Sequence, residues 1–190
     1  QLTASILQPF IGFYTDKKPR PYSLAIGMGF TLVGLAAVAI ASSFINILLA
    51  VSLIGIGSSI FHPESSRVAH LASGGKRGLA QSIFQLGGNA GSAIGPLLAA
   101  IIVVPYGQFN IIWFCLAAIV GIVILSGIAK WYQEHLNLKA KNKSAISEEK
   151  HHSLSKQKVI ISLGILLVLI FSKYFYMASM TRYYTFYLID

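Results

Sequence analysis

The sequence predicts an all-α, polytopic membrane protein, and two observations carry this prediction. Hydrophobic residues make up 55% of the 190 positions and charged residues only 11%, whereas a soluble domain usually contains about 25% charged residues. The apolar residues also occur in runs of about 20, the length at which a helix crosses a bilayer core. Because these runs are long and do not alternate between apolar and polar positions, a β-barrel is excluded.

The apolar runs follow one another with short connections. Residues 1–14 are too few to cross the bilayer alone, so we interpret them as the last part of a spanning helix. Complete spans are expected over residues 22–41, 46–66, 78–104 and 110–129, and again from residue 159 onward. The longest polar segment lies within residues 130–158, and its low hydrophobicity predicts a partly disordered linker.

Basic residues are concentrated in alternate connections, which indicates how the chain crosses the membrane. Connections 16–21, 67–77 and 130–158 contain three, three and seven Lys or Arg, whereas connections 42–45 and 105–109 contain none. Because Lys and Arg are retained on the cytoplasmic side, we expect these three connections in the cytoplasm. We therefore attribute the net charge of +9 to basic residues that orient the chain in the membrane. We expect no nucleic-acid partner.

This arrangement divides the chain into three parts. We expect an N-terminal transmembrane bundle over residues 1–129, a cytoplasmic central loop over residues 130–158, and the start of a C-terminal bundle over residues 159–190. The chain begins inside one apolar run and ends in an aromatic one, so we interpret it as a piece of a longer protein. Its partners would then be the remaining helices of that protein and the lipid bilayer.

The span over residues 46–66 ends in a cluster of ionisable residues. If that helix enters the bilayer near Ile45, a rise of 1.5 Å per residue places His62 about 25 Å and Glu64 about 28 Å along it. Arg67 lies about 33 Å along, past a core of about 30 Å, and is expected to reach the interface. For the other two, a cavity-facing position and a Glu64–Arg67 pair at i,i+3 both stay open. Pro63 is expected to bend this helix.

Amide side chains recur every four residues in the next span, at Gln81, Gln85 and Asn89. A helix places all three on one face, and polar amides facing lipid are costly. They therefore either bond neighbouring helices or, in the case of Gln85 and Asn89, line a substrate path.

Small residues form another face of the same span. This face suits close contact with a neighbouring helix, in the manner of small-xxx-small packing. The proline that follows its last glycine is expected to bend the helix. The packing and bending positions of this span are Gly87, Gly91, Gly95 and Pro96.

Lys173 is the one basic residue that lies well inside a predicted span. The same arithmetic places it about 21 Å into the last span and about 9 Å from its outer edge. Its long side chain would either reach the interface among the tyrosines or contact an anionic substrate. Cys115 is the only cysteine, and the sequence has no metal-ligand pattern, nucleophile elbow or paired acids. We therefore expect no disulfide within the chain, no metal, no cofactor and no enzymatic activity.

Two motifs resemble the major facilitator superfamily. The segment GFYTDKKPRPYS contains Gly12, Asp16, Lys17 and Arg20. It resembles the loop G-x-x-x-D-[RK]-x-G-[RK]-[RK] between helices 2 and 3 of that superfamily, with prolines where a glycine and a basic residue are usual. The segment from Gly91 to Ala100 is similar to the helix-5 motif associated with antiporters, with alanines in place of the final glycines.

A longer run, FHPESSRVAHLASGGKRGLAQSIFQLGGNAGSAIGPL, looks more specifically like the fosmidomycin resistance protein family of drug exporters. The resemblance implies a helix bundle of which this chain covers helices 2 to 7 of twelve. It also implies a secondary active transporter that exports a small drug or anionic metabolite, such as fosmidomycin, by alternating access. Protons are the implied coupling ion, and the bacterial inner membrane is the implied location. The alternatives are an exporter or importer of another small metabolite such as a sugar, a non-transporting membrane protein, or a membrane-embedded enzyme.

The resemblance also implies roles for individual residues. Asp16 and its basic neighbours would latch the cytoplasmic ends of the two halves of the transporter; the alternative is a solvated aspartate among cations that only set topology. Because helix 7 lines the central cavity in the superfamily, Lys173 joins the other polar residues as a candidate. The candidate substrate or coupling residues are His62, Glu64, Gln85, Asn89 and Lys173.

Overall fold

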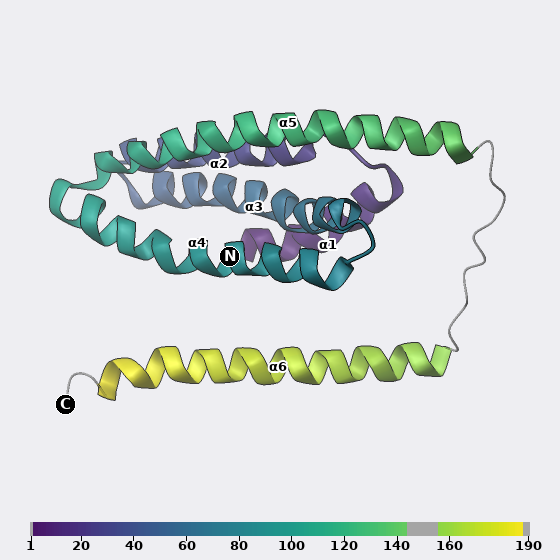
Figure 1. Ribbon diagram of the computed structural model, residues 1–190. Helices are drawn as coiled ribbons and strands as arrows, with labels where there is room; N and C mark the ends of the chain where they lie inside the picture. Colours follow the sequence, from purple (N-terminus) through teal and green to yellow (C-terminus); the bar gives the residue numbers. More distant parts are fainter. Residues whose placement is uncertain (1, 144–155, 188–190) are drawn as a thin grey trace. The chain divides into compact units, whose positions relative to one another are not determined.

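The computed structural model describes residues 2–143 and 156–187, and all regular structure in these residues is helical (Figure 1). The chain forms two compact units, Gln1–Ala145 and Ile146–Asp190. The first contains α1 (Leu2–Lys17), α2 (Ser23–Ile40), α3 (Phe44–Ala72), α4 (Arg77–Tyr106), the 3-10 helix η1 (Gln108–Ile111) and α5 (Ile112–Lys143), and the second contains α6 (Lys156–Tyr187).

Five helical segments of the described residues are long and apolar enough to cross a membrane. They are Ser23–Ile40, Phe44–Ala72, Arg77–Tyr106, Gln108–Leu138 and Gln157–Met180. α1 has only 16 residues, as expected from its short apolar run. The predicted all-α class and its five complete spans are confirmed. The three-part division at residues 129 and 158 stays a prediction.

The bundle is built on a close contact between α2 and α3. A Cβ atom added at Gly34 of α2 would lie 2.9 Å from the Ala50 carbonyl oxygen and 2.5 Å from the Ile54 side chain on α3. At Gly27 it would lie 3.1 Å from the carbonyl oxygen of Gly57. The glycines therefore let the two backbones approach more closely than larger residues would allow, as small residues do in membrane helix pairs.

Two further helices cover this pair. α1 packs on α3 and α5 packs on α2, where Gly121 of α5 lies against Met28. Most buried apolar side chains of the core are small, among them Ala39, Ala50, Ala118 and Cys115. Such a core is typical of helices that associate in lipid through close backbone packing.

Two polar side chains organise the end of the bundle at which α2 ends and α3 begins. Gln108 of η1 donates through Nε2 to the carbonyl oxygens of Val38 (2.6 Å) and Ala41 (2.9 Å), and thereby adds hydrogen bonds to backbone carbonyls where α2 ends. Ser43 caps α3, and its side chain accepts from the Asn46 amide at 3.3 Å.

Two helices continue further than the sequence predicted. α3 runs to Ala72, so the connection to α4 shrinks to residues 73–76, where Gly74 and Gly75 have φ of +53° and +91°. α5 runs to Lys143 into the segment predicted as a linker. Residues 130–143 contain no Gly or Pro and include four Lys and two Leu, which favour helix. The remaining residues of that predicted linker, 144–155, lie outside the described ones.

α4 differs from the other helices of the bundle because it has no buried residue. α4 contacts α3 and η1 with only some of its residues. A Cβ added at Gly87, Gly91 or Gly95 would meet no described atom within 4 Å. The role of these glycines in helix packing stays a prediction.

Candidate functional site

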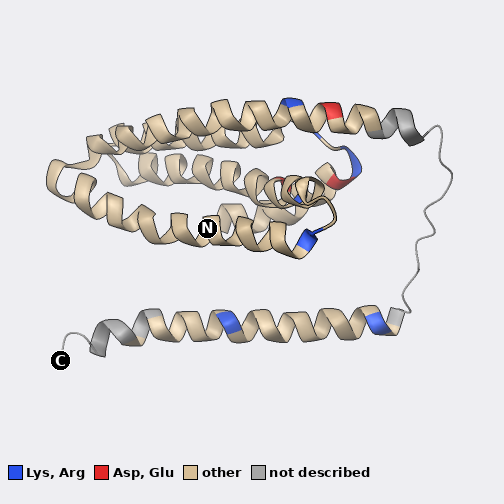
Figure 2. Cartoon of the chain, in the orientation of Figure 1, with Lys and Arg blue, Asp and Glu red and all other residues tan. Residues whose placement is uncertain are grey.

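Charged residues of the bundle gather where α1 ends, where α3 ends and where α5 leaves the apolar region, and we call this the basic end (Figure 2). The connection from α1 to α2 supplies Lys17, Lys18 and Arg20, and the connection from α3 to α4 supplies Lys76 with Arg77. The acids Asp16 and Glu64 lie at the same end. This places the predicted latch segment beside the ionisable cluster of α3.

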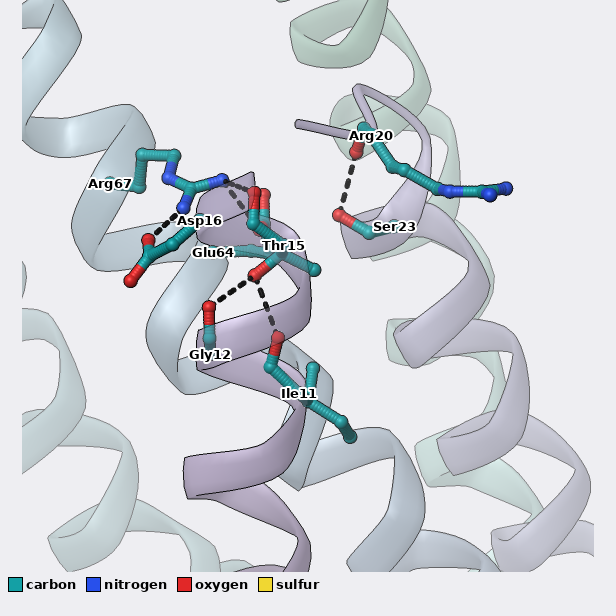
Figure 3. A network of polar contacts seen from close by, with 8 residues as sticks. All are labelled: Ile11, Gly12, Thr15, Asp16, Arg20, Ser23, Glu64 and Arg67. Atoms are coloured by element: carbon teal, nitrogen blue, oxygen red, sulfur yellow. Dashed lines mark hydrogen bonds and ion pairs between the residues drawn. The ribbon is translucent and has the colours of Figure 1, made fainter. Parts of the chain in front are cut away.

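Arg67 joins the two groups (Figure 3). Its Nη2 atom donates to Asp16 Oδ1, and its Nη1 atom donates to the Thr15 carbonyl oxygen at 2.6 Å. Nη1 also donates to Glu64 Oε1 at 3.1 Å, one turn earlier on α3. Arg67 further interacts with the side chain of Tyr132 on α5. One guanidinium therefore connects α1, α3 and α5, and we call these contacts the Arg67 clamp.

The two carboxylates of the clamp differ in burial. The Glu64 side chain is 1% exposed and the Asp16 side chain is 75% exposed. Tyr132 is also buried, and Glu64 Oε2 has no hydrogen-bond partner among the described residues. Removing one member of a buried ion pair typically costs about 3–5 kcal/mol, whereas an exposed pair contributes about 0–1 kcal/mol. Glu64 therefore holds Arg67 in place, and Asp16 is the partner that is easily released.

Other residues of the predicted latch segment form contacts within α1. Thr15 is buried and donates through Oγ1 to the carbonyl oxygens of Ile11 (2.9 Å) and Gly12 (3.2 Å). Lys17 Nζ lies 4.1 Å from the centroid of the Phe13 ring.

Arg20 turns to another aromatic ring of α1. Its Nη2 atom donates to the Tyr14 hydroxyl at 3.0 Å. Its carbonyl oxygen accepts from Ser23 Oγ at 2.8 Å (Figure 3). Of the predicted latch residues, Asp16 is thus the one that pairs with α3. Gly12 lies beside that pairing: a Cβ added there would be 3.8 Å from Pro63 Cβ, an ordinary contact.

The other candidate residues of α3 and α4 lie on a second, open side. His62 is exposed, with its ring edge-on to Phe61 at 6.5 Å between centroids. Gln81, Gln85 and Asn89 are exposed as well, and Gln81 Oε1 accepts from Ser66 Oγ at 3.2 Å. The structure therefore separates two residues that are neighbours in sequence: Glu64 faces the closed bundle, whereas His62 faces away from it.

Lys173 lies on α6, in the second unit, with Nζ 6.0 Å from the centroid of the adjacent Tyr174 ring. It is thus close to an aromatic ring of its own helix. In the part of the chain that the structure describes, no group of three or more His, Cys, Asp or Glu is arranged to hold a metal ion. The roles of the candidate substrate and coupling residues stay predictions.

The sequence left the pairing of Glu64 with Arg67 open, and the structure shows that pair. The sequence did not indicate that the Arg67 guanidinium also donates to Thr15 and Asp16 on α1, and its position at the membrane interface stays a prediction. The i,i+3 spacing to Glu64 was the available signal. No local signal identified Tyr132, which reaches the clamp from 65 residues further along the chain.

Comparisons with known proteins agree with the fold. The Major Facilitator Superfamily profile matches residues 1–190. The chain is 58% identical to the fosmidomycin resistance protein of Escherichia coli (strain K12) and 45% identical to the uncharacterized MFS-type transporter YfnC of Bacillus subtilis (strain 168). Each alignment covers 100% of this chain and 46% of the relative, so the chain spans about half the length of the curated relatives it matches. No solved structure matches the chain.

These matches confirm the predicted resemblance, the integral membrane location and the expectation of a transporter rather than an enzyme. They also make the lipid bilayer the surroundings of the chain. Since the family profile extends over every residue, the chain belongs to the major facilitator superfamily of membrane transporters.

Proposed function

We propose that this chain is part of a secondary active transporter that exports a small drug or anionic metabolite, of which fosmidomycin is the first candidate. The observation that carries the proposal is the 58% identity along the entire chain to a protein named for fosmidomycin resistance. The tests below use a complete transporter polypeptide that contains this chain, because alternating access involves two halves around one site. For the same reason, the 190-residue chain reconstituted by itself should give no saturable drug flux.

Drug export is tested by expressing the complete transporter in bacteria that lack their own fosmidomycin exporter. The expected result is a higher inhibitory concentration for fosmidomycin, together with reduced cellular accumulation of the drug. Unchanged sensitivity at confirmed membrane expression would contradict the assignment of this drug. It would favour the second candidate function, transport of another small metabolite. The 45% identity to a transporter without a named substrate is compatible with that function.

Proton coupling forms part of the same proposal, with His62 and Glu64 as the candidate coupling residues. In inverted vesicles, drug uptake should rise when a pH gradient, acidic inside, is imposed and fall when an uncoupler collapses it. Glu64 is held by Arg67 and buried, so Glu64→Gln is expected to reduce folded protein as well as flux, whereas the exposed His62 admits His62→Gln without that cost. Flux that ignores the gradient would contradict proton coupling.

We further propose that the Asp16–Arg67 contact opens during the transport cycle. Asp16 is the exposed partner of the clamp, and a conformational change can only be biased by contacts that differ between its states. Asp16→Asn should therefore shift the balance of states with little effect on folding. Labelling of cysteines introduced at the two mouths of the transporter reports this balance, and equal labelling of variant and parent would leave Asp16 with a topological role only.

Lys173 provides a test of substrate contact in the second unit. If its ammonium group contacts an anionic substrate, Lys173→Gln should lower drug resistance more than Lys173→Arg, since arginine keeps the charge. If Lys173 only reaches the interface, both variants should behave like the parent. Equal resistance of the parent and Lys173→Gln at matched protein levels would end the contact hypothesis.

A further inference from the structure

An apolar groove lies between α2 and α3, and it begins within one turn of the start of α2. Its volume is about 390 Å³, within the range of about 300–1,000 Å³ that is usual for ligand sites. The groove is open, because a Cβ added at Gly29 would meet no described atom within 4 Å. The residues that line it are all apolar: Ile26, Gly29, Phe30, Leu32, Val33 and Leu53.

The groove covers the depth of the acyl chains of one bilayer leaflet. α2 is a candidate membrane span that begins at Ser23. A rise of 1.5 Å per residue places Ile26 about 5 Å and Val33 about 15 Å from Ser23 along the helix axis. Half of a bilayer core of about 30 Å is about 15 Å. A ligand that fills this groove from the membrane therefore needs an apolar chain whose polar end stays near the start of α2.

Polar and basic residues stand at that end of the groove. Tyr22 precedes Ile26 by four residues, and Gly29 and Val33 follow at spacings of three and four, so these positions share one face of α2. Tyrosine is a residue typical of the membrane interface. The connection before Tyr22 contains Lys18 and Arg20, and both are exposed.

Arg20 is held where α1 and α2 meet. Its Nη2 atom donates to the Tyr14 hydroxyl of α1, and its carbonyl oxygen accepts from Ser23 Oγ. Its guanidinium points away from the Arg67 clamp (Figure 3). A guanidinium has five N–H donors, and in the described part of the chain Tyr14 is the side chain that accepts from them. Asp16, the acid nearest in sequence, is engaged by Arg67, so the end of the groove is positively charged.

We propose that the groove and its basic end bind an anionic phospholipid, with the phosphate at Lys18 and Arg20 and one acyl chain in the groove; we call this the lipid site. Arginine donors match phosphate oxygens in geometry. Anionic lipids are concentrated in the cytoplasmic leaflet, the side on which we expect this connection. A zwitterionic lipid would fill the groove but bring no net charge to the cations. The lipid site does not depend on which substrate is transported.

The experiment compares two lipids that share their acyl chains and differ in the head group. Dioleoylphosphatidylglycerol and dioleoylphosphatidylcholine are titrated onto the delipidated complete transporter in detergent, and bound lipid is counted by mass spectrometry of the intact complex. Because each basic residue near a membrane surface contributes about fivefold in affinity for anionic lipid, the parent should bind the anionic lipid about tenfold or more tightly than the zwitterionic one.

Head-group recognition is tested at Arg20. Arg20→Gln should weaken binding of phosphatidylglycerol about fivefold and leave phosphatidylcholine unchanged, and Arg20→Lys should keep most of the affinity. Arg77→Gln is the matched control, since Arg77 is an exposed arginine at the basic end that lies at the start of α4. Its loss should leave binding of both lipids within about twofold of the parent. Equal losses in Arg20→Gln and Arg77→Gln would assign the effect to the total charge of the basic end and overturn the lipid site.

The groove is tested at Gly29. Gly29→Val fills the open space, so it should weaken both lipids while the melting temperature in detergent without added lipid stays that of the parent. Gly127→Val is the control, because an added Cβ at Gly127 of α5 also meets no described atom within 4 Å; it should leave binding unchanged. Equal affinity of the parent for the two lipids would overturn the proposal. A Gly29→Val variant that loses stability and keeps its lipid affinity would also overturn it, by showing that another helix of the transporter covers the groove.

Discussion

The two sides of α3 differ in what they face. On its closed side, α3 lies against α1 and α2, with glycines at the backbone contacts and a buried carboxylate held by Arg67. On its open side, it lies beside α4 through Ser66 and Gln81, and the polar side chains there are mostly exposed. The same helix thus supports the bundle on one side and leaves polar groups available on the other. We expect changes on the closed side to reduce stability and changes on the open side to alter ligand binding.

The largest expected effect is that of removing Arg67 from the closed side. Arg67→Gln leaves the Glu64 carboxylate buried without its cation, and such a loss typically costs about 3–5 kcal/mol. The complete transporter in detergent should then lose folded protein at a markedly lower temperature, measured by size-exclusion chromatography after heating. The double variant Glu64→Gln/Arg67→Gln removes the unpaired charge and should recover part of the loss. Equal melting of Arg67→Gln and the parent would contradict the structural role of the clamp.

The next effect concerns the backbone contact of α2 with α3. In Gly34→Val the new side chain meets the Ala50 carbonyl oxygen and Ile54, and overpacking of this kind costs about 1–3 kcal/mol. The matched control is Gly29→Val on the same helix, where an added Cβ meets no described atom within 4 Å. Thermal stability should fall for Gly34→Val and stay close to the parent for Gly29→Val. Similar losses in both variants would assign the effect to helix propensity instead of packing.

The smallest effect is expected on the open side. Ser66→Ala removes one hydrogen bond near the surface, and such bonds contribute about 0.5–1.5 kcal/mol at most. The melting temperature of the complete transporter in detergent should therefore change little. A large loss of stability would show that the α3–α4 contact carries more of the fold than its exposure indicates, and the contrast between the two sides of α3 would not hold.

Much of this protein is determined by its sequence alone. The long apolar runs fix the helices and their spans, because a chain in lipid must satisfy its backbone hydrogen bonds within each helix. The spacing of Gln81, Gln85 and Asn89 already placed three amides on one face, and the i,i+3 spacing of Glu64 and Arg67 already allowed their pairing. The motif around Asp16 was recognisable for the same reason: its residues are neighbours in the chain.

The tertiary structure decided which of these local possibilities meet. Only the packing of α1 on α3 brings Asp16 to Arg67, 51 positions away, and only the approach of α5 buries Tyr132 beside them. Likewise, the Ser66–Gln81 bond joins side chains of α3 and α4 that the spacing within either helix does not bring together. Periodicity defines the faces of one helix, but which faces pack together depends on contacts between residues far apart in the sequence, and a single sequence carries no local signal for them.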